Sequence, residues 1–213
     1  MIKYSLKFIV SIMTAIIYLL TFSINVAASE INISGLNELP EEYQNNINGM
    51  LDSISDGVID LYNITGGTVY FKQALLDDGT GENLNIMGLY FPESSDIHIR
   101  SDEYAIRKSG TSISKITAHE IGHFIYHKAY LFLSPESKDV LLSCFNYWKN
   151  YSPECYNEDE TFAVIYSWEK TGMGYLTKDV QLMIAEAENI CRNLALHIEE
   201  KGNDIGPGTL IRP

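Results

Sequence analysis

Apolar and polar positions follow two different periods along the chain. Between Pro40 and about Tyr62, apolar residues recur at three- and four-residue steps, which predicts one helix with Pro40 in its first turn. After Gly66 and Gly67, the apolar residues gather in short runs rich in β-branched and aromatic side chains. These runs predict strands over residues 68–71, 87–91 and 96–100.

From Ser112 onward the helical period returns, and it predicts a succession of helices. They are expected from about Ser114 to Leu131, from Ser134-Pro135 onward, from near Asn157 to before Gly172, and from Thr177 to about Lys201 with Gly202 as the stop. A first half that contains strands and a helical second half predict an α+β fold. No repeat or Pro/Gly/Ser-rich linker divides residues 29–213, so one domain is expected there.

The N-terminal segment has the pattern of an export signal. Lys3 and Lys7 precede an uncharged, mostly apolar run over residues 8–22, and Val26-Ala27-Ala28 supplies small residues for a cleavage site. We therefore predict a signal peptide over residues 1–28 and a secreted, extracellular chain from residue 29. The alternative is an uncleaved membrane anchor, since residues 8–28 carry no charge.

Composition narrows the range of partners. The 213 residues include 28 acidic and 15 basic side chains, and the formal net charge is −13. This charge argues against nucleic acid and against an anionic membrane surface, because both are bound by clusters of Lys and Arg. The three cysteines, an odd number, form no metal-binding knuckle, and their spacing indicates no disulfide pairing.

The most informative motif is His119-Glu120-Ile121-Gly122-His123, in the middle of a predicted helix. Two histidines four residues apart lie on one face, about 6 Å apart along the axis, where both can reach one tetrahedral zinc ion. Glu120 lies beside that position and can accept a proton from metal-bound water. His127 is about 12 Å from His119 along the axis, too far to share the ion. The alternative is a solvated helix face.

A third ligand must come from another segment. Carboxylates gather where the helix near Asn157 begins, at Glu154, Glu158, Asp159 and Glu160. In isolation, Glu160 would be explained as the partner of Asn157 in a capping box. Beside a histidine pair that lacks a third ligand, a metal-binding role is favoured.

The segments around His119-Glu120-x-x-His123 and Glu160-Thr161-Phe162-Ala163, 37 residues later, resemble the anthrax lethal factor-like metallopeptidases, which include secreted Pro-Pro endopeptidases. The resemblance covers residues 95–170. It implies a zincin-like domain with a small mixed sheet and an active-site helix. It also implies one zinc ion bound by His119, His123 and Glu160, and makes proline-rich substrates conceivable.

The chain departs from that family at two positions. Val164 stands where the family has a second Glu, and the expected tyrosine position, seven residues before the ligand, is Pro153. The residue that hydrogen-bonds the developing oxyanion is therefore expected to be either Tyr151 or Tyr156. Glu158 remains the alternative third ligand, since it keeps the seven-residue spacing from Tyr151.

These patterns predict a secreted zinc endopeptidase in which Glu120 is the general base and the partner is a protein or peptide substrate. The strand at residues 96–100 is expected either to form a sheet edge that pairs with the substrate main chain or to be purely structural. Two other functions remain open. One is a non-catalytic secreted zinc-binding or toxin-like module, and the other is a metallohydrolase of a non-peptide amide.

Overall fold

The computed structural model describes residues 30–73, 76–77, 81–82, 86–103, 106–107 and 111–204. The predicted signal peptide, residues 1–28, lies outside these residues. From Ile31 onward the chain forms one compact unit with a mixed α+β architecture. Among the described helices, none combines the length and the apolar character that a membrane span requires.

A mixed sheet of four strands is ordered β1-β2-β6-β5. Its strands are β1 (Ile33–Ser34), β2 (Val69–Lys72), β5 (Gly88–Phe91) and β6 (Asp96–Arg100). The first three in spatial order are parallel, and β5 pairs antiparallel with β6. A two-stranded ladder, β3 (Leu76–Asp77) with β4 (Gly81–Glu82), is separate from this sheet. The three predicted strands are confirmed to within a residue.

The prediction that residues 96–100 form an edge strand is wrong. β6 lies between β2 and β5, and its Ile97 and Ile99 are fully buried. Among the described strands β5 lies at this end of the sheet, with β6 as its only neighbour. The alternation of β6 places Ile97 and Ile99 on one buried face, but it carries no information about how many strands pair with it.

The single helix predicted over residues 40–62 is two helices, α2 (Glu41–Leu51) and α3 (Asp56–Ile64). Between them Ser53 donates its hydroxyl to the Met50 carbonyl, and Ser55 adopts an extended conformation. Ser in this position competes with the helical backbone for hydrogen bonds, which favours a break. Pro40 precedes the first turn as the N-cap instead of lying within it.

The second half is helical, as predicted. It contains α5 (Ile113–Ala129), the short 3-10 turn η2 (Tyr130–Phe132), α6 (Pro135–Trp148), α7 (Glu158–Thr171) and α8 (Lys178–Asp204). The hydroxyl of Ser134 caps α6, and Gly172, with a φ of 64°, ends α7. Gly202 does not end α8, which continues to Asp204. One Gly costs a helix about 1 kcal/mol relative to Ala, which a long helix tolerates.

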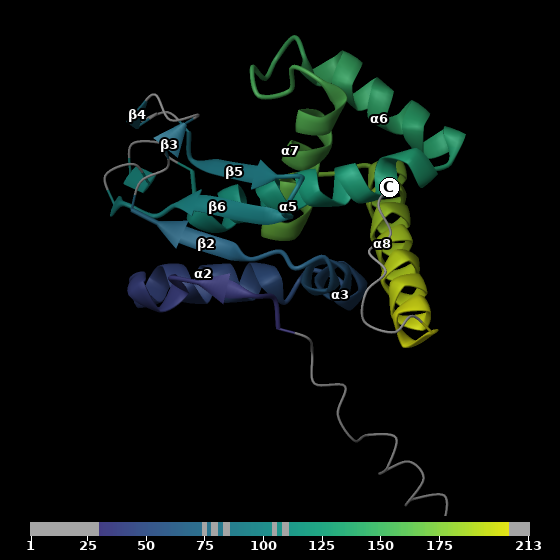
Figure 1. Ribbon diagram of the computed structural model, residues 1–213. Coiled ribbons are helices and arrows are strands. Elements are labelled where there is room, and N and C mark those ends of the chain that lie inside the picture. The colour runs from purple at the N-terminus through teal and green to yellow at the C-terminus, as the bar shows by residue number, and fades with distance from the viewer. Residues whose placement is uncertain are drawn as a thin grey trace, which may run out of the picture. The chain divides into compact units, whose positions relative to one another are not determined.

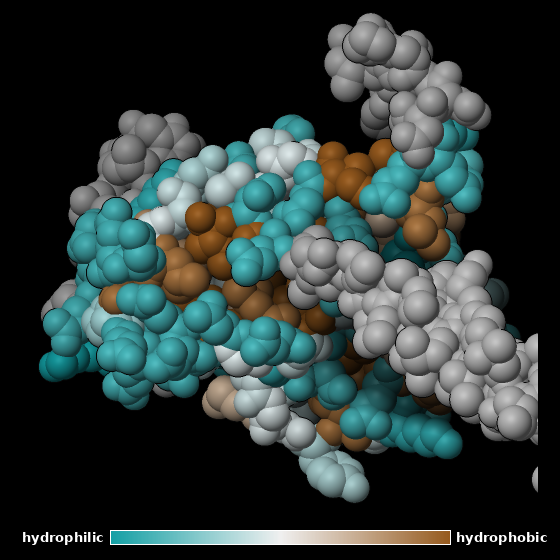
Figure 2. Space-filling model, turned by 90° about the horizontal axis from the view of Figure 1, so that it is seen from below, coloured by the Kyte–Doolittle hydropathy of each residue, from teal (hydrophilic) through white to brown (hydrophobic). Residues whose placement is uncertain are grey.

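Helix α5 is the centre of this architecture, because it packs against α2, α7, α8, β5 and β6. It is buried around most of its circumference, as expected for a helix enclosed by other elements. In Figure 1 the strands β2, β5 and β6 and helix α5 lie in the middle, with α2 and α3 below them and α6 above. The lower face is largely hydrophilic, with apolar residues gathered in its middle (Figure 2).

Candidate metal centre

Helix α5 places His119 and His123 next to each other, one turn apart. Its N-cap, Ser112, accepts a hydrogen bond from the Lys115 amide. The helix is therefore already formed where the motif begins. The Nε2 atoms of the two imidazoles are 3.1 Å apart. The predicted pairing of His119 and His123 on one helix face is confirmed.

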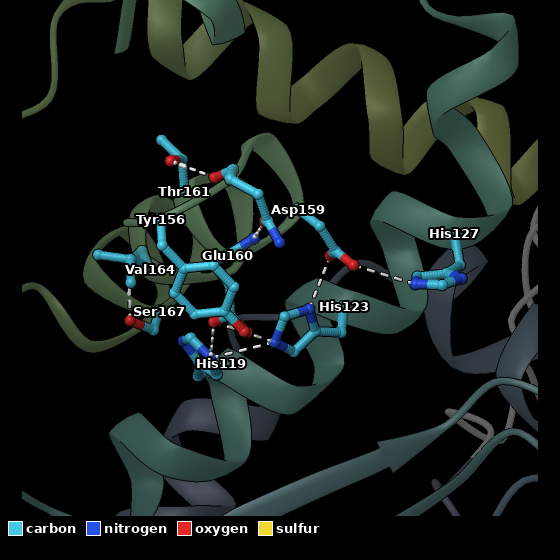
Figure 3. A network of polar contacts seen from close by, with 10 residues as sticks. His119, His123, His127, Tyr156, Asp159, Glu160, Thr161, Val164 and Ser167 are labelled. Atoms are coloured by element: carbon cyan, nitrogen blue, oxygen red, sulfur yellow. Dashed lines mark hydrogen bonds and ion pairs between the residues drawn. The ribbon is translucent and has the colours of Figure 1, made fainter. Parts of the chain in front are cut away.

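Helix α7 brings Glu160 to the same point (Figure 3). Its Oε2 lies 3.2 Å from Nε2 of His119 and 3.5 Å from Nε2 of His123. The Asn157 side chain accepts a hydrogen bond from the Glu160 amide, so Glu160 is fixed in the first turn by its backbone while its carboxylate faces the histidines. Glu158 instead accepts a hydrogen bond from the hydroxyl of Tyr130.

The three side chains can bind a metal ion. One donor atom from each of His119, His123 and Glu160 lies within 4.8 Å of the other two. Ligands bonded to a tetrahedral zinc ion at about 2.0–2.1 Å stand about 3.3–3.4 Å apart, close to the separations found here. Two imidazoles and one carboxylate also leave a tetrahedral ion with one open position.

Asp159 is a functional candidate that the sequence analysis did not identify. Its Oδ1 accepts a hydrogen bond from Nδ1 of His123 at 2.6 Å, and its Oδ2 lies 3.0 Å from Nε2 of His127 (Figure 3). A carboxylate on the outer nitrogen of a ligand histidine fixes the ring orientation and leaves the inner nitrogen for the metal. The acidic run 158–160 was visible in the sequence, but its partners depend on how α7 crosses α5.

Hydrogen bonding sets the charges of this cluster. Burial opposes ionisation of His123, but the hydrogen bonds to Asp159 and Glu160 outweigh it and raise its pKa to about 10. Burial likewise opposes ionisation of Glu160, but the bonds from His119, His123 and Tyr156 hold its pKa well below the ordinary value. The carboxylate is therefore ionised, as a metal ligand must be, whereas His123 must release a proton when it binds a metal ion.

Glu120 follows His119 on α5, interacts electrostatically with His119, His123 and Glu160, and is only 6% exposed. Burial raises the pKa of its carboxyl, and the neighbouring His119 and His123 partly offset that effect. A carboxyl with a raised pKa beside a metal-binding cluster is a candidate proton acceptor.

A glycine allows the two helices of the site to approach closely. A Cβ placed on Gly122 would lie 2.7 Å from Cα of Ala163, which is backbone of α7. The absence of a side chain at Gly122 therefore sets the separation of α5 and α7. Because Glu160 and both histidines lie on these two helices, this packing determines the distances within the cluster.

The two candidate tyrosines lie in different surroundings. The hydroxyl of Tyr156 donates a hydrogen bond to Oε1 of Glu160 at 2.7 Å, and this bond is the main reason why its pKa is raised to about 12. Tyr151 is 72% exposed and its ring contacts Tyr147. Val164, at the position of the family's second Glu, is buried and apolar.

The cysteines and the residues that line one cavity do not belong to the metal-binding group. Cys144, Cys155 and Cys191, all within the described residues, are free thiols. A cavity of about 560 Å³ is formed by α6, α7, α8 and the loop that precedes α8. Trp148, Trp168 and Tyr175 are among its aromatic walls.

Comparison with known proteins adds no relative. No protein-family model matches the chain, and no curated protein is significantly similar to it.

Proposed function

We propose that this protein is a secreted zinc-dependent endopeptidase with a zincin-like catalytic domain of the lethal factor-like type. The observation that carries the proposal is the convergence of His119, His123 and Glu160 on one point, with the buried carboxyl of Glu120 beside it. A structural zinc site fills the fourth position with a protein ligand and needs no neighbouring base. The arrangement around Glu120 therefore favours catalysis over a purely structural site.

In this proposal the side chains have separate tasks. His119, His123 and Glu160 would hold the zinc ion, which would lower the pKa of a water molecule and polarise the scissile carbonyl. The carboxylate of Glu120 would accept a proton from the attacking water and pass it to the leaving amine. Tyr156, whose hydroxyl already lies at the cluster, donates a hydrogen bond to the carbonyl oxygen as negative charge develops on it. Asp159 keeps the ring of His123 in the orientation needed for metal binding.

The substrate is proposed to lie along β5. Among the described strands this one has a neighbour on one side only, and it passes directly over Glu120 through Gly88. An extended peptide can add to such an edge through main-chain hydrogen bonds, which favours a peptide over a compact small molecule. Phe91, at the end of the strand, is partly exposed and can contact a substrate side chain.

The decisive experiment is incubation of the zinc-loaded protein with a peptide library, with and without chelator. We expect cleavage that chelation abolishes and zinc restores. The Glu120→Gln variant should bind zinc like the wild type and lose about 10²–10⁴-fold in kcat, which is the usual contribution of general-base catalysis. A zinc-bound protein that cleaves no peptide would favour the non-catalytic module, and hydrolysis of non-peptide amides alone would favour the other metallohydrolase.

The oxyanion donor can be identified with one pair of variants. Tyr156→Phe should lower kcat by about 10²-fold, since loss of one oxyanion donor typically costs 10²–10³-fold. Tyr151→Phe should leave kcat unchanged, because its ring packs against Tyr147, whereas the hydroxyl of Tyr156 is the one bonded to Glu160. The reverse result would transfer the role to Tyr151.

A further inference from the structure

Gly88 has no conformational reason to be a glycine. It lies in β5, paired with Ile99 of β6, and it does not belong to the glycines with positive φ, which are Gly35, Gly66 and Gly172. Glycine inside a strand weakens the strand, because it has no side chain to pack and loses more conformational entropy than other residues. A glycine here therefore calls for another explanation.

The space beside Gly88 is taken by the carboxyl group of Glu120. A Cβ placed on Gly88 would lie 2.7 Å from Cγ and 2.8 Å from Cδ of Glu120, and it would also overlap Oε1. Carbon atoms in ordinary contact are about 3.5–4.0 Å apart. Any residue other than glycine at this position would therefore push the Glu120 side chain away from its present place.

The atoms that would move are the end of a flexible side chain. A clash of this kind is relieved by a rotamer change, at little cost to the fold. Glu120 is nevertheless buried, so its movement is confined to the space around the metal-binding group. A side chain at Gly88 would thus disturb the position of the carboxylate and leave His119, His123 and Glu160 in place.

We propose that Gly88 is a positioning residue that holds the Glu120 carboxylate against the metal-binding group by leaving no side chain between β5 and α5. The geometry of this inference comes from the contact between Gly88 and Glu120. The expected effect on kcat rests on the proposed function. Gly88 acts here through Glu120, whose side chain supplies the three atoms nearest to the missing Cβ.

The test compares Gly88→Ala with a matched glycine substitution. Gly49→Ala is the control, because a Cβ on Gly49 meets no atom within 4 Å. We expect Gly88→Ala to retain its zinc affinity to within about twofold and to lose about 10²-fold in kcat on a peptide substrate, since a misplacement of 1 Å can cost that much. Gly49→Ala should match the wild type in both. Unchanged kcat in Gly88→Ala, or a loss explained by lost zinc, would overturn the proposal.

A second variant separates positioning from general damage to the fold. Glu120→Asp is shorter by one methylene and withdraws the carboxyl group from the space that the new methyl occupies. The double variant Gly88→Ala/Glu120→Asp should therefore lose much less in kcat than the product of the two single losses. Losses that multiply would show that the two positions act independently, and would overturn the inference.

The inference can fail separately from the proposed function. If the zinc-loaded wild type cleaves no peptide, the proposed function is overturned, and the position of Glu120 is then read from crystal structures of the wild type and Gly88→Ala. A displaced carboxylate with unchanged ligand positions supports the role of Gly88. A carboxylate that has not moved overturns it.

Discussion

Helix α7 presents two different environments on two of its sides. Toward α5 it carries Asp159 and Glu160, whose carboxylates contact imidazoles, and Ala163, which packs against Gly122. Toward α6 it carries Ile165 and Trp168, which line the cavity of about 560 Å³. On the α5 side the polar groups form hydrogen bonds and ion pairs with each other. On the α6 side aromatic rings line a cavity. The hollow faces α6, whereas the side chains that can bind a metal ion lie on the closely packed side.

The two sides of α7 differ in how closely the neighbouring helix approaches. A metal-binding group requires several donor atoms about 3 Å apart, and backbones that approach closely can hold them there. Aromatic side chains such as Trp148 and Trp168, with ring centroids 5.1 Å apart, keep their helices further from each other and leave gaps. The variants below test whether the two sides of α7 are as independent as this comparison implies.

The largest effect is expected from Glu160→Ala. Mutation of a residue that hydrogen-bonds a metal ligand typically lowers metal affinity by about 10- to 100-fold. Loss of one of the three ligands themselves should lower zinc affinity by more than about 100-fold. A competition titration against a chromophoric chelator measures it. Glu158→Ala is the matched control, because that carboxylate is bonded to Tyr130 and should not affect zinc. Should Glu158→Ala be the variant that loses zinc, Glu158 would be the third ligand.

The second-largest effect is expected from Asp159→Asn. It keeps the size of the side chain but weakens the hydrogen bonds to His123 and His127, so zinc affinity should fall by about 10- to 100-fold. The same titration applies, with His127→Gln as a comparison that removes the imidazole from one oxygen of Asp159 only. We expect the His127 variant to lose less. Zinc affinity unchanged in Asp159→Asn would mean that the ring of His123 is fixed by packing.

On the other side of α7, Trp168→Ala should affect stability and spare the metal site. The half-buried indole stacks edge-on against Trp148, and its removal should lower the free energy of unfolding by about 2 kcal/mol, below the 3–5 kcal/mol typical of a fully buried Trp. Zinc affinity and kcat should stay within about twofold of the wild type. A loss of zinc affinity comparable to that of Asp159→Asn would contradict the independence of the two sides.

The smallest effect concerns the N-terminus of α6, the helix whose C-terminal half lines the cavity. Burial would raise the pKa of Glu186, but hydrogen bonds from Ser137 and from the amide and hydroxyl of Ser134 outweigh it and lower the pKa. A lowered carboxyl pKa stabilises the fold above the unfolded-state pKa, and this contribution is lost as the pH falls through the folded-state pKa. Glu186→Gln should therefore flatten the acidic limb of a plot of melting temperature against pH. If the acidic limb of the variant is identical to that of the wild type, the charge of Glu186 does not contribute to stability.

Most of the elements could be predicted because their signals are local. The helix caps at Ser134 and Asn157, and the strand at 96–100, appear where the sequence places them. The break between α2 and α3 was missed because the apolar period runs through it undisturbed, while the turn depends on side-chain hydrogen bonds such as that of Ser53. The position of β6 inside the sheet was missed because strand order depends on segments far apart in the chain.

What the sequence determined by itself is the pair His119 and His123 with Glu120 between them, since their spacing on one helix follows from helical geometry alone. Only the tertiary structure brought Glu160 to the two histidines and Glu158 to Tyr130, joined Asp159 to His123 and placed Gly88 beside Glu120. These contacts are between residues of different elements. They depend on how closely α7 and β5 pack on α5. A helix encodes its own periodicity, whereas contacts between elements are fixed by the shape of the whole core.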